Sequence, residues 1–180
     1  MQLPTSQPQG PAVASPWVER FANLVPEGGA VLDLAAGGGR HSVLFRRRGH
    51  PVVAVDRAVA ALSALAADDP GLEVIEADLE APGAPWPVGE RRFAGIVVTN
   101  YLHRPLFGAI RAALAPGGAL IYETFAAGNE RFGKPSNPDF LLRPGELLGL
   151  AAGLRIVAYE NLEIAEPRPA MVQRIAAVNG

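Results

Sequence analysis

The chain has 180 residues and contains no cysteine. This absence excludes disulfide bonds, thiolate metal sites, iron–sulfur clusters and a cysteine nucleophile, and we predict no metal site. A surplus of charge of one sign is also missing, because 16 Lys and Arg residues stand against 18 Asp and Glu residues. A chain so close to neutral lacks the basic face with which sequence-independent nucleic-acid binders attract phosphates, so no nucleic-acid partner is expected.

Long hydrophobic runs are missing as well. The longest apolar stretches have about eight residues, far fewer than the roughly 20 that a membrane-spanning helix needs. Residues 1–17 show neither the basic start nor the hydrophobic run of a secretory signal. The sequence therefore predicts a cytoplasmic protein without a membrane partner, and it leaves the oligomeric state open.

The first 15 residues differ in composition from the rest. They contain three prolines among Gln, Ser and Thr, and this composition predicts a disordered N-terminal lead over 1–15. Ser15-Pro16 then provides a hydroxyl cap and a proline at the first helical position, which is typical of a helix start. Residues 16–180 have the length of a single domain.

Short apolar segments alternate with segments of helical periodicity along this domain. Uninterrupted apolar strands are buried on both faces, as in a parallel sheet covered by helices. The last two predicted strands are joined by a tight Glu-Pro-Arg-Pro turn, so they are expected to be antiparallel neighbours. The predicted fold is α/β, a doubly wound seven-stranded, mostly parallel sheet that ends in an antiparallel hairpin. The predicted strands cover 30–36, 51–56, 72–78, 93–100, 119–125, 154–164 and 169–178.

Acidic residues and glycines follow the first three predicted strands. Asp33 and Gly37–Gly39 lie where the first strand passes into a helix, Asp56 ends the second strand and Asp78 ends the third. Open α/β sheets bind ligands outside the carboxyl ends of their strands, and glycines there let the backbone approach a ligand closely. A carboxylate at Asp56 can accept hydrogen bonds from both hydroxyls of a ribose. The three acids are therefore expected to converge on one crevice.

These segments resemble the class I S-adenosylmethionine-dependent methyltransferases. VLDLAAGGGR is similar to the family's first motif, with Ala35 in place of the first glycine, and LAPGGALIYETF is similar to its turn and fifth strand. The resemblance implies S-adenosylmethionine as cofactor, with Asp33 near its methionine part, Asp56 on the ribose and Asp78 on the adenine amine. The full set of cofactor-binding residues that it implies is Asp33, Ala35, Gly37, Gly39, Arg40, His41, Asp56, Arg57, Asp78, Leu79 and Asn100.

The acceptor of the methyl group is expected above the fourth and fifth strands. Three residues there are candidates for catalysis: His103 as a general base, Tyr101 to orient the acceptor, and Glu123 as an acid at the end of the fifth strand. Asn100 and Tyr101 resemble a motif of nucleic-acid amino-group methyltransferases, but the two prolines of that motif are missing. The connection 126–142 carries two phenylalanines and little periodicity, which favours a lid.

DLAAGGGRHS and LLRPGELL most resemble the small tellurite-resistance-type methyltransferases. That resemblance implies a small acceptor, including an anionic one, with His103, Arg104, Arg131 and Lys134 as the source of positive charge. Two other functions stay open. One is an NAD(P)-binding Rossmann oxidoreductase, because Gly37, Gly39 and Ser42 approximate a dinucleotide-binding fingerprint. The other is a non-catalytic S-adenosylmethionine-binding subunit.

Overall fold

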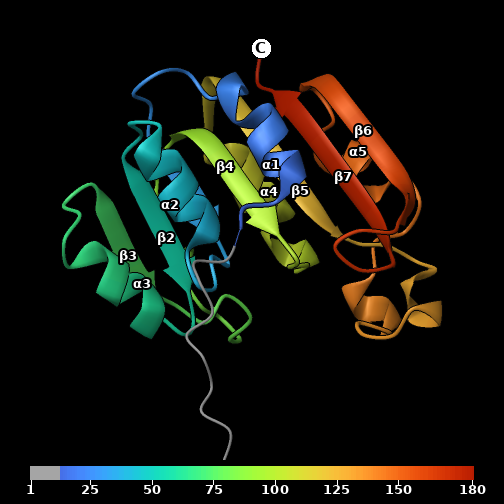
Figure 1. Ribbon diagram of the computed structural model, residues 1–180. Helices are drawn as coiled ribbons and strands as arrows, with labels where there is room; N and C mark the ends of the chain where they lie inside the picture. The colour runs from blue at the N-terminus through green and yellow to red at the C-terminus, as the bar shows by residue number, and fades with distance from the viewer. Residues whose placement is uncertain (1–12) are drawn as a thin grey trace, which may run out of the picture.

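A computed structural model describes residues 13–180, in which seven strands form a single sheet (Figure 1). The strand order is β3-β2-β1-β4-β5-β7-β6. The predicted fold is confirmed, including the antiparallel pairing of β6 with β7. The strands are β1 (Val31–Leu34), β2 (Val52–Asp56), β3 (Leu72–Glu76), β4 (Phe93–Thr99), β5 (Leu114–Phe125), β6 (Arg155–Ile164) and β7 (Ala170–Val178).

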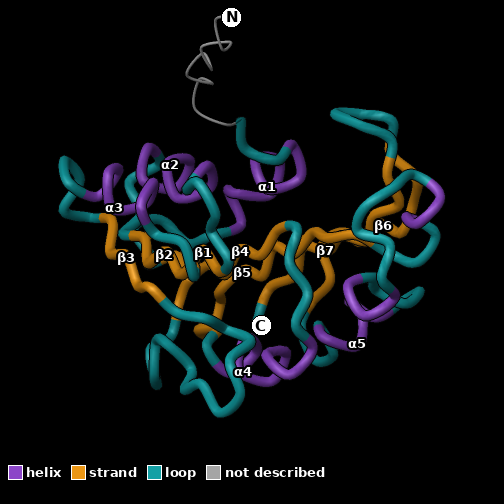
Figure 2. Tube along the Cα trace, turned by 90° about the horizontal axis from the view of Figure 1, so that it is seen from below, coloured by secondary structure: helices purple, strands orange, loops and turns teal. Residues whose placement is uncertain are grey.

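Helices cover both faces of this sheet. In Figure 2 the first three α-helices lie on one face and the last two on the other. Short 3₁₀ helices complete the connections at 22–24, 104–106, 129–131 and 138–140. The α-helices are α1 (Pro16–Phe21), α2 (Arg40–Arg47), α3 (Ala60–Ala66), α4 (Phe107–Ala112) and α5 (Glu146–Leu150).

The core is split by the sheet into two layers of apolar side chains. All four residues of β1 are buried, and their side chains alternate between the two layers, as expected of a central strand with helices on both sides. Phe45 of α2 and Trp17 of α1 pack in one layer, and Ile110 of α4 and Leu147 of α5 pack in the other. Burial on both faces therefore explains why β1, β2 and β4 are mainly apolar, whereas the less buried strands β3 and β6 carry several charged residues.

The sheet topology places the ends of β1, β2, β3 and β4 along one edge. Adjacent pairs among these four strands are parallel, with Asp33 of β1 opposite Ala54 of β2 and Val97 of β4. The chain leaves β1 toward β2 on one side, whereas β4 lies on the other side of β1. Such a reversal of strand order opens a crevice at the carboxyl ends, which is where ligands bind in open α/β sheets.

The N-terminal lead was predicted over 1–15, and residues 1–12 of it lie outside the described residues. Ser15, in contrast, already belongs to the fold, because it is buried and its side chain accepts a hydrogen bond from the amide of Trp17 at the start of α1 (3.2 Å). Ser15, the last residue of the predicted lead, therefore contacts the folded domain. A serine that caps a packed helix shares the order of that helix.

The connection between β5 and α5 is ordered by contacts of its own. Asn129 is buried, and its side chain donates to the carbonyl of Pro135 (2.9 Å) and accepts from the amide of Met171 on β7 (3.1 Å). Ala126 forms a bridge with Leu142, so the two ends of the connection lie together. This segment extends beyond the lower end of the sheet in Figure 1. Within residues 13–180, no helix combines the length and the apolar character needed to cross a membrane.

Candidate functional site

The turn after β1 alternates in backbone conformation. Ala35, Gly37 and Gly39 have φ angles of 55°, 57° and 82°, in the left-handed region that glycine adopts without strain. A Cβ atom at Gly39 would lie 2.8 Å from the side chain of Leu65 and 2.9 Å from that of Leu62. Gly39 is therefore required both by its conformation and by the close packing of α3 on the turn.

Asp56, the last residue of β2, fixes this turn. Its Oδ2 accepts a hydrogen bond from the amide of Gly37 (2.8 Å), and its Oδ1 accepts one from the amide of Ala58 (3.0 Å). The two strands are parallel neighbours, so the end of β2 lies beside the turn that follows β1. Each carboxylate oxygen keeps a further lone pair for a ligand.

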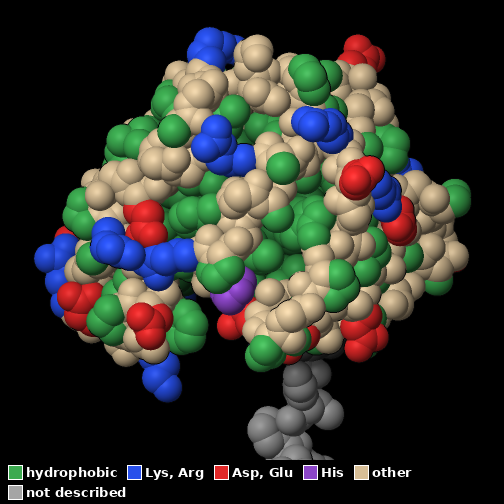
Figure 3. All heavy atoms as spheres, turned by 180° about the vertical axis from the view of Figure 1, so that it is seen from behind, with side chains coloured by type: hydrophobic (Ala, Val, Ile, Leu, Met, Phe, Trp, Pro, Cys, Tyr) green, Lys and Arg blue, Asp and Glu red, His purple; other side chains and the backbone are tan. Residues whose placement is uncertain are grey.

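A cavity of about 310 Å³ opens beside Asp56, at the ends of β1, β2 and β3. Asp78 enters it from the loop after β3, where its Oδ1 accepts from the amide of Glu80 (3.0 Å). In Figure 3 a notch divides the lower edge of the molecule between the loops after the strands and the segment that follows β5. The cavity is lined by Ala35, Asp56, Arg57, Ala77, Asp78, Leu79, Glu80, Tyr101 and Phe140.

Tyr101 belongs to the wall of this cavity. Its Oη is buried and has no hydrogen-bond partner within the described part of the chain. Burial, followed by the nearby charge of Glu80, raises the pKa of Tyr101, so the phenol stays protonated at neutral pH. The backbone carbonyl of Tyr101 is held by the hydroxyl of Tyr122 (2.8 Å), and the preceding residue, Asn100, has a φ of 53°. The loop is therefore held in place, with the phenol buried close to the carboxylate of Glu80.

Asp33 lies beneath the glycine turn and is almost fully buried. Its Oδ2 accepts a hydrogen bond from the hydroxyl of Ser42 (2.6 Å). Burial raises the pKa of Asp33 to about 6, because the loss of solvation outweighs the hydrogen bond from Ser42 and the charge of Arg40. A nearby cation would stabilise the ionised form of this carboxyl group.

His41 contacts the N-terminal segment, and it is absent from the lining of the cavity. Its Nε2 accepts a hydrogen bond from the amide of Ser15 (3.1 Å), and its Nδ1 lies 3.5 Å from the hydroxyl of Thr99. Burial, and then the charge of Arg40, lowers the pKa of His41 to about 3, so the ring is neutral. The guanidinium of Arg40 is also directed to this segment, since it donates to the carbonyl of Val13 (3.4 Å).

The three residues proposed for catalysis do not meet at one point. Tyr101 lines the cavity, whereas His103 and Glu123 do not. His103 is half-buried and immediately precedes the 3₁₀ helix 104–106. The carboxylate of Glu123 accepts from the hydroxyl of Ser15 (2.6 Å) and pairs with Arg174 of β7 (3.1 Å). Glu123 is thus part of the contact that fixes α1 to the sheet.

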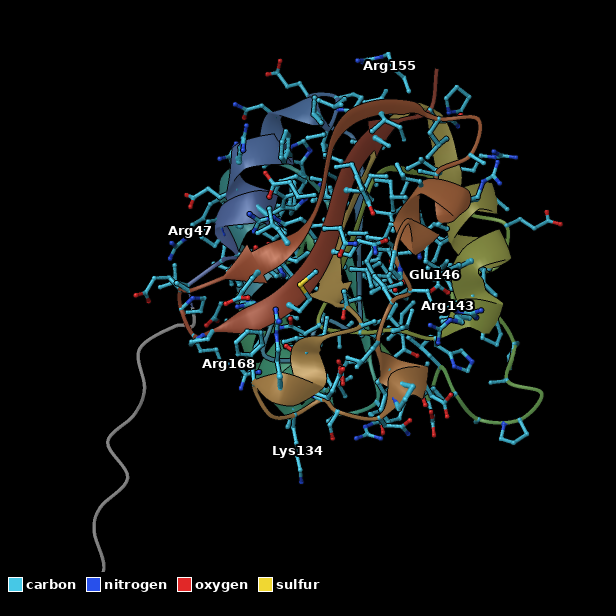
Figure 4. The ribbon with its side chains drawn as sticks, turned by 90° about the vertical axis from the view of Figure 1, so that its right-hand side faces the viewer. Arg47, Lys134, Arg143, Glu146, Arg155 and Arg168 are labelled. Atoms are coloured by element: carbon cyan, nitrogen blue, oxygen red, sulfur yellow. The ribbon has the colours of Figure 1, made fainter. Side chains whose placement is uncertain are left out.

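The basic residues that were expected to meet an anionic acceptor are engaged elsewhere. Arg104 pairs with Glu146, and Arg131 pairs with Glu163 (2.7 Å). Lys134 is exposed, and Figure 4 shows it pointing away from the molecule. These side chains therefore give no support to an anionic acceptor.

Most of the predicted cofactor residues surround the cavity or the turn beside it. Ala35, Asp56, Arg57, Asp78 and Leu79 line the cavity, and Gly37 faces a more open hollow on the other side of Asp56. Three lining residues were not predicted, namely Ala77, Glu80 and Phe140. Phe140 follows an Asn-Pro-Asp turn in which the side chain of Asn137 accepts from the amide of Asp139 (3.0 Å). This turn motif is recognisable in the sequence.

Comparisons with solved structures place this geometry in a known fold. The chain is similar to TehB from Haemophilus influenzae, with a TM-score of 0.72 at 18% identity over 91% of this chain, and it spans 61% of the TehB chain. It is also similar to the 1,6-didemethyltoxoflavin-N1-methyltransferase of Burkholderia thailandensis, whose structure contains S-adenosylhomocysteine (TM-score 0.68, 21% identity, 91% of this chain and 76% of that chain).

A third similar structure is a TehB-like S-adenosylmethionine-dependent methyltransferase from Corynebacterium glutamicum (TM-score 0.63, 19% identity, 89% of this chain and 86% of that chain). No model of a protein family matches the chain, and no curated protein matches it. The chain therefore has the Rossmann-like fold of S-adenosylmethionine-dependent methyltransferases, as the resemblance in its sequence implied.

Proposed function

We propose that the chain binds S-adenosylmethionine in the cavity at the ends of β1, β2 and β3 and transfers its methyl group to a small-molecule acceptor. The observation that carries the proposal is the convergence of Asp56, Asp78 and the left-handed turn at Ala35–Gly39 around one cavity. This convergence occurs in a fold that the chain shares with methyltransferases, one of which contains S-adenosylhomocysteine.

The polar groups of the cavity fit the parts of this cofactor. Asp56 offers carboxylate lone pairs to the two ribose hydroxyls, and Asp78 offers them to the exocyclic amine of adenine. Asp33, whose pKa is raised by burial, would regain an ionised carboxylate beside the positively charged end of the cofactor. When bound, S-adenosylmethionine supplies a methyl group on a sulfonium, an electrophile that needs no metal.

The chain's own residues then have mainly to position the reactants. Tyr101 keeps its proton at neutral pH, so it does not act as a base, and we assign its side chain to the wall of the cavity. His103 is the remaining candidate for a base. Because Glu123 is held by Ser15 and Arg174, we assign it to the attachment of α1 and leave it out of the chemistry.

Titration calorimetry with S-adenosylmethionine, S-adenosylhomocysteine, NAD⁺ and NADP⁺ tests the proposal. We expect both adenosyl compounds to bind and both dinucleotides to fail, and we expect Asp78→Ala to weaken binding of the adenosyl compounds. Binding of NAD(P) alone would support the oxidoreductase and contradict the proposal. Methylation of any small acceptor by the purified chain would exclude a non-catalytic subunit.

A further inference from the structure

Arg104 makes several connections just after β4. Its Nε and one terminal nitrogen donate to the two carboxylate oxygens of Glu146 at the start of α5 (2.5 and 3.0 Å). Its terminal nitrogens also donate to the backbone carbonyls of Asp139 (2.7 Å) and Leu141 (2.9 Å). A guanidinium has five N–H donors, so these four contacts leave little capacity for an additional anion.

The two carbonyls that Arg104 holds lie on either side of Phe140. Phe140 lines the same cavity as Asp56 and Asp78, although 49% of its own surface is exposed. The next residues, Leu141 and Leu142, are buried, so the segment is anchored downstream of Phe140. Upstream of Phe140, the residues Ser136–Asp139 are exposed, and Arg104 provides a fixed point between them and the ring.

Glu146 in turn keeps Arg104 in place. It accepts from the backbone amide of Arg143 (2.8 Å) in addition to its pair with Arg104, and its side chain is 16% exposed. Burial alone would raise the pKa of Glu146, but the hydrogen bonds from Arg104 and from the Arg143 amide outweigh burial and hold it below its usual value. Figure 4 shows Glu146 on α5, with Lys134 pointing away from the molecule on the segment that precedes this helix.

We infer that Arg104 is a positioning residue: paired with Glu146, it holds the peptides on both sides of Phe140 and so keeps this ring over the proposed cofactor cavity. The inference rests on the proposed function for the identity of the ligand. Arg104 is thus assigned no contact with the acceptor, whereas its positive charge alone predicted that it would bind an anion. An arginine is required there because only its planar fork reaches a carboxylate and two carbonyls at once.

The test is a double-mutant cycle on the affinity for S-adenosylhomocysteine. We expect Phe140→Ala and Arg104→Gln each to weaken binding about tenfold, as the loss of a covering aromatic ring implies. We expect the double variant to bind no more weakly than either single variant, because both changes remove the same cover. The control Arg131→Gln breaks an exposed ion pair of the same connection and should leave affinity unchanged. The inference would be overturned if the loss of affinity in the double variant equalled the product of the two single losses, or if Arg104→Gln left the affinity unchanged.

Amide hydrogen exchange of the ligand-free protein gives a second reading that needs no cofactor. Residues 137–142 should exchange faster in Arg104→Gln, and they should keep the rate of the unaltered chain in Arg131→Gln. If Arg104→Gln fails to fold because Glu146 is left without its partner, the pair of changes Arg104→Gln and Glu146→Gln removes that unpaired charge and takes its place. Absence of binding by the unaltered chain would contradict the proposed function, whereas unchanged exchange at 137–142 would contradict the positioning role itself.

Discussion

The amide of Gly37 donates a 2.8 Å hydrogen bond to the carboxylate of Asp56, which joins the turn after β1 to the end of β2. The acid expected to bind a ribose therefore also shapes the backbone that would lie against the cofactor. Two functions on one carboxylate make its loss more costly than the loss of a ribose contact alone. Replacement by alanine, which removes both functions, should therefore have a larger effect than replacement by asparagine, which removes the charge but keeps an oxygen.

We predict that Asp56→Ala weakens binding of S-adenosylhomocysteine by about 2–3 kcal/mol, which is a factor of roughly 30–150. Asp56→Asn should weaken it less, because an amide oxygen can still accept from Gly37 and from one ribose hydroxyl. Titration calorimetry measures both variants, and Asp68→Ala, a change at an exposed acid after α3, is the control. Equal affinities of Asp56→Ala and the unaltered chain would contradict the assignment of the cavity.

Asp33 is expected to reduce stability above neutral pH. Its pKa is about 6 in the folded chain and 3.8 when unperturbed, so the folded form holds its proton more tightly. The stability that this proton provides is complete below about pH 4 and is lost as the pH rises through 6. The shift corresponds to at most about 3 kcal/mol at pH 7.

Replacement of Asp33 by Asn removes the charge and keeps an oxygen for the Ser42 hydroxyl. We predict that the free energy of unfolding of Asp33→Asn, relative to the unaltered chain, increases between pH 4 and pH 7 and is constant above that range. Urea unfolding at several pH values checks this, with Asp68→Asn as the exposed control. A stability difference that does not vary with pH would show that Asp33 keeps an ordinary pKa.

Ser15 is predicted to stabilise the fold through three contacts. It caps α1, its amide donates to His41, and its hydroxyl donates to Glu123. Ser15→Ala removes both side-chain contacts and should lower the free energy of unfolding by about 1–2 kcal/mol. Glu123→Gln should be destabilising too, because it removes one of the two carboxylates, those of Glu123 and Glu160, with which Arg174 pairs within residues 13–180.

Thermal unfolding of these two variants measures their loss of stability. Together with the rate of methyl transfer, it separates a structural role of Glu123 from a catalytic one. If Glu123 only attaches α1, methyl transfer by Glu123→Gln well below its melting temperature should match that of the unaltered chain. A loss of turnover of a hundredfold or more in a folded Glu123→Gln variant would restore the catalytic assignment.

The strands could be predicted, and the acids proposed to bind the cofactor could be singled out, because their signals are local. A strand buried on both faces is mainly apolar, as β1 and β2 are, and the two acids are recognisable because Asp56 ends β2 and Asp78 comes two residues after β3. The contacts of Ser15 could not be predicted in this way. His41 and Glu123 are 26 and 108 residues away from it, and nothing in their immediate neighbourhood distinguishes them from residues that point into the crevice.

Phe140 and Arg104 show the same limit in the loops. The connection 126–142 has no periodicity that would reveal which side chain turns inward, and the partners of Arg104 lie 35 to 42 residues away. Charge alone indicated that Arg104 would face an anion, but Glu146, a partly buried carboxylate of the chain itself, takes that place. Side-chain pairing across loops depends on the completed fold, which local sequence does not contain.

The turn after β1 provides a last prediction, based on Ala35 and Gly39, which both have a positive φ angle. Ala35 has a φ of 55°, a conformation that costs a residue with a Cβ atom roughly 1 kcal/mol relative to glycine. Ala35→Gly should therefore raise the free energy of unfolding by up to about 1 kcal/mol. Gly39→Ala should lower it by more than that, because the new methyl group would also meet Leu62 and Leu65.

Urea unfolding of both variants tests the two opposite changes in the free energy of unfolding. Calorimetry with S-adenosylhomocysteine measures how each change affects the affinity of the site. Ala35 lines the cavity, so the added room and flexibility of Ala35→Gly should leave affinity equal or lower even though the fold becomes more stable. Destabilisation by Ala35→Gly would mean that the methyl group contributes more through packing than it costs through strain. In that case the alanine at the position of the motif's first glycine is a packing residue of this chain.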